Sequence, residues 1–444
     1  MRGVALATQS EAACAALDRA IDALAAHHLD AGDHLRAARA ADPLLVLADV
    51  IEGFGAVLLG RRDLWPHARA CHARAQAQTD ALGAPPRESA LCAALGAAAC
   101  GDPLACIEHL DAATREAPRD LLAVKLSHAM LFVVGDSEGM RRRAELAASA
   151  FVAGVPGRDR VLGMLAFALV ETGELERAGR VGREATHLAR GHAWAAHAVA
   201  HVMEMRGRVR EGEAWLSQNE DILEGCHNFR GHVHWHHALF ELALGRADAA
   251  LHRYDVEVAP YLGRGEELGR DYRDLANASS LLFRMERQGI GVADRWEHVA
   301  DAAAAHWDDH GLAFADTHRV LALAGAGRHA DAERLVASLR ASMLQLPAHT
   351  RAVDADVGAP VAEATHALFC GDPQRAYALL SASRPQWPRL GGSLAQRDTY
   401  ELLHLHAALA CGRFGVAREL LRARERSGRS VRWASDALLE TRAT

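Results

Sequence analysis

A recurring glycine is the sequence feature that most constrains this fold. Each glycine closes an Ala-rich apolar stretch and is followed about five residues later by a small residue. The spacings are 41, 34, 38, 34, 38, 44, 38, 44 and 41 residues. Such spacings are typical of stacked helix-turn-helix repeats. The glycines are Gly60, Gly101, Gly135, Gly173, Gly207, Gly245, Gly289, Gly327, Gly371 and Gly412.

The residues between these glycines favour helices. Aromatic residues make up only 5% of the chain, and β-branched residues are scattered singly, so no segment reads as a strand. Small residues such as Ala178, Ala185 and Ala250 would let two helices of a hairpin approach closely. We therefore predict an all-α protein, an α-solenoid of tetratricopeptide-like helical hairpins. Residues 1–444 would form a single superhelix whose first 100 residues are less regular.

Composition excludes several classes of function. A net charge of −7 offers no basic surface for a nucleic-acid backbone. The eight cysteines form no CxxC pair and fit buried reduced thiols. We find neither a signal-peptide core nor a span of about 20 apolar residues, and we expect a cytoplasmic protein. Dinucleotide, NTP and serine-hydrolase motifs are also missing from the sequence.

Two neighbouring repeats carry histidines four residues apart. They are GHAWAAHAVAHVMEMRG, with His197, His201 and Glu204, and GHVHWHHALFELALG, with His232 and His236. Residues at this spacing share one face of a helix. The repeat register places them, together with His318, on the concave surface of a tetratricopeptide-like array. We predict that the histidine pairs converge in one pocket.

The spacing by itself is weak evidence. A chain with 26 histidines would give roughly one or two HxxxH pairs by chance, and this one has three. A core or solvated histidine is therefore a serious alternative at each position.

Five ordered blocks resemble the tetratricopeptide repeat protein thirty-eight family over roughly residues 160–425. They are WAAHAVAHVMEMRG, HVHWHHALFELALGRADAALHRYD, DLANASSLLFRMERQG, DDHGLAFADTHRVLALAGAGR and GGSLAQRDTYELLHLHAAL. The resemblance implies an α-solenoid and no settled reaction. The family pattern favours His197, His201, Glu204, His232, His236, Asp255, Asp316, His318 and the block from Gly391 to Asp398.

One hypothesis is an enzyme with a small-molecule pocket in the concave groove. Histidines oriented by carboxylates would transfer protons. The candidate catalytic residues are His197, His201, Glu204, His232, His236, Asp255 and His318. The candidate substrate-binding residues are Asp309, His310, Asp316, Gln396, Arg397, Asp398 and Trp235.

A metal-assisted variant uses His197, His201, His232 and His236 as ligands of a divalent transition metal, zinc or iron. No HExxH, CxxC or EF-hand signature accompanies them.

Two further hypotheses assign the histidines other roles. The protein could be an interaction scaffold whose groove clamps a peptide, or the histidines could form a pH-sensitive network that locks adjacent repeats. The expected partner is thus a small molecule or a peptide, with neither nucleic acid nor membrane involved. Homo-oligomerisation is left open.

Overall fold

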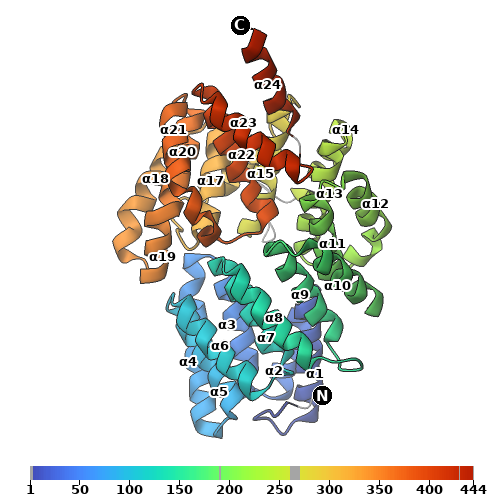
Figure 1. Ribbon diagram of the computed structural model, residues 1–444. Helices are drawn as coiled ribbons and strands as arrows, with labels where there is room; N and C mark the ends of the chain where they lie inside the picture. Colours follow the sequence, from blue (N-terminus) through green and yellow to red (C-terminus); the bar gives the residue numbers. More distant parts are fainter. Residues whose placement is uncertain (1–3, 190–191, 261–270, 430, 444) are drawn as a thin grey trace. The chain divides into compact units, whose positions relative to one another are not determined.

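The computed structural model describes residues 4–189, 192–260, 271–429 and 431–443. These residues are helical apart from turns, loops and an isolated bridge between His28 and Cys226 (Figure 1). The all-α prediction is confirmed. The chain forms two compact units: unit 1 comprises Met1–Val199, Asn219–Phe229 and Pro347–His349, and unit 2 comprises Ala200–Gln218, Arg230–Leu346 and Thr350–Thr444.

The helices that begin in unit 1 before residue 200 are α1 Glu11–Ala26, α2 Ala31–Ala41, α3 Val46–Leu58, α4 Trp65–Leu82, α5 Pro86–Ala99, α6 Pro103–Glu116, α7 Leu121–Val134, α8 Ser137–Ala150, α9 Arg158–Glu171, α10 Leu175–Leu188 and α11 Ala193–Met205. The later helices are α12 Val209–Gln218, α13 Phe229–Ala243, α14 Ala247–Arg253, α15 Tyr272–Arg287, α16 Arg295–Ala304, α17 Ala313–Gly325, α18 His329–Ser342, α19 Ala348–Val353, α20 Ala359–Phe369, α21 Pro373–Ser383, α22 Leu394–Ala410, α23 Phe414–Arg426 and α24 Arg432–Ala443. Short 3-10 segments lie at η1 Arg62–Leu64, η2 Glu220–Leu223, η5 Met343–Gln345 and η7 Arg384–Leu390, and π-helical segments lie at η3 Tyr254–Val258 and η6 Asp354–Gly358.

The repeated glycines all end the first helix of a hairpin. Every one of the ten has φ between 63° and 82°, the left-handed region that glycine enters at little cost. After Gly207, the Arg208 N–H donates to the Met203 carbonyl at 2.8 Å, and after Gly245 the Arg246 N–H donates to the Glu241 carbonyl at 2.9 Å. This hydrogen bond closes a helix end in the Schellman motif. The glycine spacing therefore located the hairpin turns correctly.

The residue after the glycine can start the next helix. Asp102, Asp136 and Asp372 each cap a second helix by accepting a backbone hydrogen bond from the residue three positions ahead. A Gly-Asp pair thus ends one helix and begins the next.

Hairpins stack in the same way within each unit. In unit 1, α4 packs against α5, α6 against α7 and α8 against α9; in unit 2, α16 packs against α17, α18 against α20 and α21 against α22. Each second helix therefore covers the first helix of the next hairpin. The predicted small contact residues Ala178, Ala185 and Ala250 are fully buried. That residues 1–444 form a single superhelix stays a prediction.

Two features of the fold were not visible in the glycine pattern. The first hairpin, α1 with α2, turns at His27, which adopts φ 62° in the place of a glycine. Each of the two 44-residue spacings, Gly245 to Gly289 and Gly327 to Gly371, contains one of the π-helical segments, η3 and η6. The longest repeats therefore contain irregular helix.

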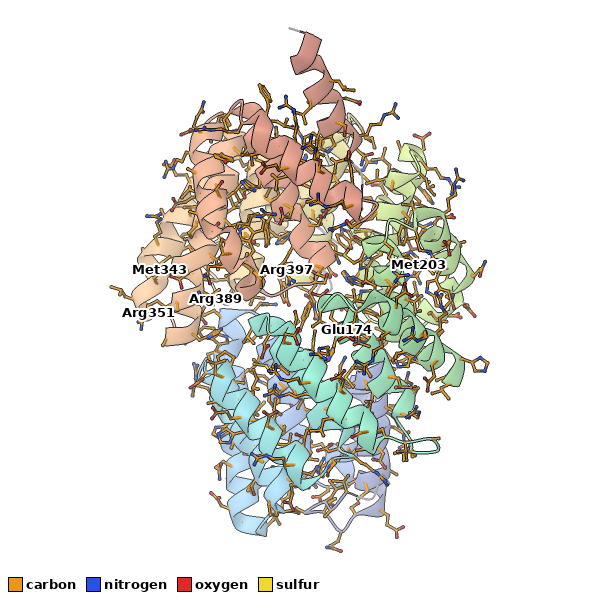
Figure 2. All side chains as sticks on the ribbon, in the orientation of Figure 1. Glu174, Met203, Met343, Arg351, Arg389 and Arg397 are labelled. Atoms are coloured by element: carbon orange, nitrogen blue, oxygen red, sulfur yellow. The ribbon has the colours of Figure 1, made fainter. Side chains whose placement is uncertain are left out.

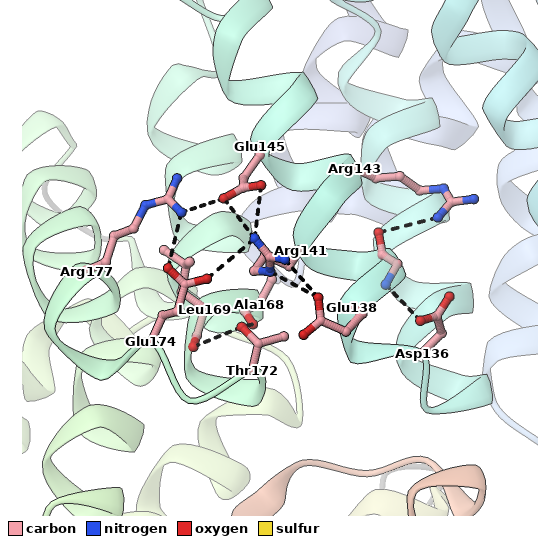
Figure 3. Close-up of polar contacts among 11 residues, drawn as sticks. Asp136, Glu138, Arg141, Arg143, Glu145, Ala168, Leu169, Thr172, Glu174 and Arg177 are labelled. Carbon is pink, nitrogen blue, oxygen red and sulfur yellow. Dashed lines mark hydrogen bonds and ion pairs between the residues drawn. The ribbon is translucent and has the colours of Figure 1, made fainter.

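Ion pairs link adjacent hairpins on the surface of unit 1 (Figure 3). Arg141 on α8 contacts Glu138 and Glu145 on its own helix and Glu174 in the turn after α9. Arg177 on α10 contacts Glu145 and Glu174. Each exposed ion pair contributes little to the stability of the fold. The network as a whole mainly determines which faces of the hairpins meet.

The cysteines only partly match the expectation of burial. All eight are free thiols; Cys71, Cys92, Cys106 and Cys226 are buried, whereas Cys100 and Cys370 are exposed. The expectation was wrong for these two, which directly follow the last residues of α5 and α20. Among the described helices, none combines the length and apolar character needed to cross a membrane.

Candidate metal centre

Helices α11 and α13 carry the predicted histidines, and each is the first helix of its hairpin. His201 and Glu204 lie on α11, and His232 and His236 lie on α13. A spacing of three or four residues keeps side chains on one face of a helix. His197, the fourth predicted ligand, belongs to unit 1, so its part in the site stays a prediction.

The three predicted histidines of unit 2 converge. One ring nitrogen from each of His201, His232 and His236 lies within 4.8 Å of the others. The ring centroids of His201 and His236 are 4.2 Å apart, and those of His232 and His236 are 4.9 Å apart. Both pairs meet edge to face. We call these three residues the histidine cluster.

Burial keeps the imidazoles of unit 2 neutral. His201 and His236 are 0% exposed. Burial, and then the nearby His236, lowers the pKa of His232 to about 3. Burial and the Arg284 guanidinium lower the pKa of His236 to about 3, and burial with His236 takes the pKa of His201 well below its ordinary value. A neutral imidazole is the form that binds metals.

Two polar side chains orient these rings. The Nδ1 atom of His236 lies 2.7 Å from Oε2 of Glu204. The Nδ1 atom of His232 lies 2.9 Å from Oδ1 of Asn277, which is buried on α15. Burial raises the pKa of Glu204, and the nearby His201 opposes that rise. A ring that donates from Nδ1 to an oxygen keeps its lone pair on Nε2, as metal-bound histidines commonly do.

Trp235 on α13 packs between His232 and residues of helix α15. The Trp235 ring is fully buried and stacks on His232 at 5.4 Å. Its Nε1–H donates to Oγ of Ser280 at 3.1 Å, and the Arg284 guanidinium lies 5.6 Å from the ring centre. Trp235 is thus packed among side chains of this chain, and its predicted role in substrate binding stays a prediction.

The positive charge of Arg284 is balanced by Asp398. The guanidinium lies 3.6 Å from the Asp398 carboxylate and donates to the Thr399 hydroxyl at 2.9 Å. Burial alone would raise the pKa of Asp398, but Arg424, Arg284 and Arg429 hold it at about 2. Asp398 is therefore ionised and paired with arginines of this chain.

Two predicted catalytic residues lie outside the histidine cluster. Asp255 is 45% exposed and pairs with Arg295 at 2.7 Å, because the π-helical segment η3 turns it to the surface. His318 is buried, and its Nδ1 lies 2.8 Å from the Phe314 carbonyl and 3.5 Å from the Tyr400 hydroxyl. Burial lowers the pKa of His318 to about 4. The expectation that these two join the paired histidines was wrong.

The predicted substrate residues Asp309 and His310, which precede α17, and Asp316 on α17 share one hydrogen-bonded network with Arg319. Arg319 donates to Asp316 at 2.9 Å and to Asp309 at 3.0 Å, and His310 lies 3.2 Å from Asp316. Burial and the charge of Asp316 raise the pKa of the nearby Asp354 to about 8. Their polar atoms are thus engaged in a buried network, and a role in substrate binding stays a prediction.

The GGSLAQRD block organises the start of α22. Ser393 and Gln396 form a capping box, in which each side chain accepts a hydrogen bond from the other residue's backbone N–H. Arg397, labelled in Figure 2, donates to the carbonyls of Gly391 and Gly392. These hydrogen bonds give Gln396 and Arg397 a role in local structure, and their predicted role as substrate ligands stays a prediction.

Sequence reasoning missed the polar face of α15. Asn277, Ser280 and Arg284 are spaced three and four residues apart in DLANASSLLFR, so they share one helix face. That spacing was a usable signal. The helix that they would face could not be read from sequence, because it depends on how the hairpins pack.

Comparison with known proteins adds little to this description. No family model matches the chain. A solved structure titled "Structure of Naa15/Naa10 bound to HypK-THB" aligns with 96% of this chain and 65% of its own, at 13% identity and a TM-score of 0.25. The chain thus spans about two thirds of that structure's length. A similarity this low carries no argument about function.

Proposed function

We propose that the histidine cluster binds a divalent transition metal, zinc or iron, and that this centre binds and transforms a small molecule. We also propose that the chain belongs to the tetratricopeptide repeat protein thirty-eight family. The observation that carries the metal proposal is the anchoring of two Nδ1 atoms, on His236 by Glu204 and on His232 by Asn277. A ring whose Nδ1 donates to an oxygen has Nε2 as the atom that can bind a metal.

The donor set suits such a metal. Three imidazoles from His201, His232 and His236 match the nitrogen ligands of zinc and non-haem iron sites. Tetrahedral zinc with bonds of about 2.0–2.1 Å would place its nitrogens about 3.4 Å apart. Because the ligand atoms lie within 4.8 Å of one another, modest side-chain rotations would bring them to that separation.

The local charges permit a cation. The Glu204 carboxylate lies against His236 on the side opposite its Nε2, and the guanidinium of Arg284 is paired with Asp398. A bound metal would supply Lewis acidity or an activated water. The chain itself would hold the ligand rings neutral and oriented, and Trp235 would exclude water from one side.

The pKa values favour metal binding over metal-free proton transfer. A general acid or base works best when its pKa lies near the working pH. His232 and His236, with pKa values near 3, are poorly matched to proton transfer at neutrality. Their low basicity is no obstacle to metal binding, since metals bind the neutral ring.

Metal analysis of the full chain purified without a His-tag tests the proposal. We expect His236→Asn to contain about one equivalent of zinc or iron less than the wild type. His237→Asn is the matched control. His237 lies on the same helix, is also buried, and contacts Ser217 instead of the cluster. Far-UV circular dichroism and the unfolding midpoint show whether each variant folds.

A metal content below about 0.2 equivalents, with no gain on reconstitution, would refute the metal site. Equal metal loss in both variants would also count against it. In either case the peptide-clamping scaffold, with structural histidines, becomes the leading hypothesis.

A further inference from the structure

A second group of metal-competent side chains lies on α18 and α20 of unit 2. His329 is the first residue of α18, His366 lies on α20, and Cys370 directly follows the last residue of α20. One ligand atom from each lies within 4.8 Å of the other two. Nε2 of His366 and Sγ of Cys370 are 3.2 Å apart, and the rings of His329 and His366 are 6.3 Å apart.

Two repeat turns bring these residues together. His366 and Cys370 are four residues apart on one helix face, and Gly371 ends that helix with φ 82°. Gly327 forms the equivalent turn just before His329, with φ 71°. Because α18 packs against α20, His329 lies opposite the His366–Cys370 pair.

The spacing fits a zinc-type ion. With Zn–S of about 2.3 Å and Zn–N of about 2.0–2.1 Å, tetrahedral geometry separates sulfur from nitrogen by about 3.6 Å. The observed separation for His366 and Cys370 is 3.2 Å. A small rotation of His329 would complete three ligands. Cys370 is exposed and both histidines are half-buried, so water can reach the fourth position.

The surrounding charges favour a cation. Glu333 follows His329 by one helical turn, and its carboxylate adds to the effect of burial in raising the pKa of the Cys370 thiol. The nearest sequence neighbour with positive charge, Arg328, is paired with Asp301 at 2.8 Å and with Asp331 at 2.7 Å. Negative charge at this site is therefore not cancelled by Arg328.

We propose that His329, His366 and Cys370 form a second, surface site for a zinc-class divalent ion, with water as the fourth ligand. Binding would release the thiol proton to solvent and form the metal–thiolate bond, with no redox change. The ion would join α18 to α20 and so link two successive hairpins. This proposal does not depend on the histidine cluster.

Cobalt titration of the metal-free, untagged full chain tests the site. A cobalt–thiolate charge-transfer band requires a sulfur ligand, which the histidine cluster lacks. We expect the band to appear in the wild type and to be lost in Cys370→Ser. His329→Asn and His366→Asn should lose or weaken it, whereas His236→Asn should keep it.

Cys100→Ser is the matched control for the cysteine. Cys100 is also exposed, also follows the last residue of a helix, and also precedes a turn glycine, Gly101. The residue four positions before it is Gly96 instead of a histidine, so this variant should keep the band.

A missing band in the wild type would overturn the proposal, and so would a band that survives in Cys370→Ser. The latter result would point to the third set of metal-competent groups, Glu52, His67 and Cys71. Neither result would bear on the histidine cluster, whose metal is measured in the His236→Asn and His237→Asn pair.

Discussion

Replacing Gly207 with alanine tests how the turns of this fold are encoded. Gly207 ends α11, the helix that carries His201 and Glu204, and has φ 63°. A Cβ atom at this position would lie 2.6 Å from Cα of Gly428, in the turn after α23. The two turns approach so closely that neither has room for a side chain. Gly245→Ala is the matched control, because Gly245 has φ 76° and its added Cβ would meet no atom within 4 Å.

The expected costs follow from these two differences. A non-glycine residue in the left-handed region costs about 1–2 kcal/mol, and the lower chain entropy of alanine in the unfolded state returns about 0.4–1 kcal/mol. Gly245→Ala should therefore lower the free energy of unfolding by about 1 kcal/mol. Gly207→Ala carries the same backbone cost plus about 1–3 kcal/mol for forcing two backbone segments apart.

Denaturant unfolding followed by circular dichroism measures both variants. We expect Gly207→Ala to be less stable than Gly245→Ala by about 1–3 kcal/mol, with far-UV spectra that match the wild type in both. Equal losses would mean that the close approach of Gly207 and Gly428 does not exist in solution. A wild-type stability for Gly207→Ala would refute the backbone argument as well.

Two further predictions concern the histidine cluster. Glu204→Gln should weaken zinc binding about 10- to 100-fold, which is the usual effect of losing an orienting carboxylate. The control is Asp255→Asn, at an exposed site paired with Arg295, and it should leave zinc binding unchanged. Isothermal titration calorimetry measures both affinities, and equal effects would refute the orienting role of Glu204. In the metal-free protein, the low pKa of His236 means that the unfolded state takes up its proton first. The stability that this group contributes is complete above pH 6.5 and falls by about 1.4 kcal/mol per pH unit as the pH drops toward 3. Urea unfolding between these limits should show a shallower fall in His236→Asn, and an unchanged slope would contradict the buried neutral state.

The histidine cluster shows where sequence reasoning succeeded. The spacing of His197 with His201 and of His232 with His236 placed each pair on one helix face, since helix periodicity alone decides this. Within unit 2, the convergence of His201 with His232 and His236 also followed from the stacking of neighbouring repeats. The same spacing in His306 and His310 formed no such pair, because the described helix α16 ends at Ala304 and His310 adopts φ 46°.

Other parts of the site depended on contacts that no local pattern contains. Asp255 was expected to orient a histidine, but the π-helical segment η3 rotates it toward Arg295. Asn277 contacts the ring of His232, although the two residues are 45 positions apart in the sequence. Which side chains of α15 meet α13 depends on the packing register of the two helices, and a single sequence does not record that register.

The sequence by itself determined the helical class, the positions of the ten turns and the residues that share a helix face. These properties follow from local sterics. Glycine tolerates the left-handed conformation that ends a helix, and helix periodicity decides which residues share a face. Only the tertiary structure decided which faces meet, and hence that Glu204 and Asn277 hold the histidines while Asp398 neutralises Arg284. Burial comes from that packing too. Since burial sets the pKa values of His232 and His236, the chemical character of the cluster is a tertiary property.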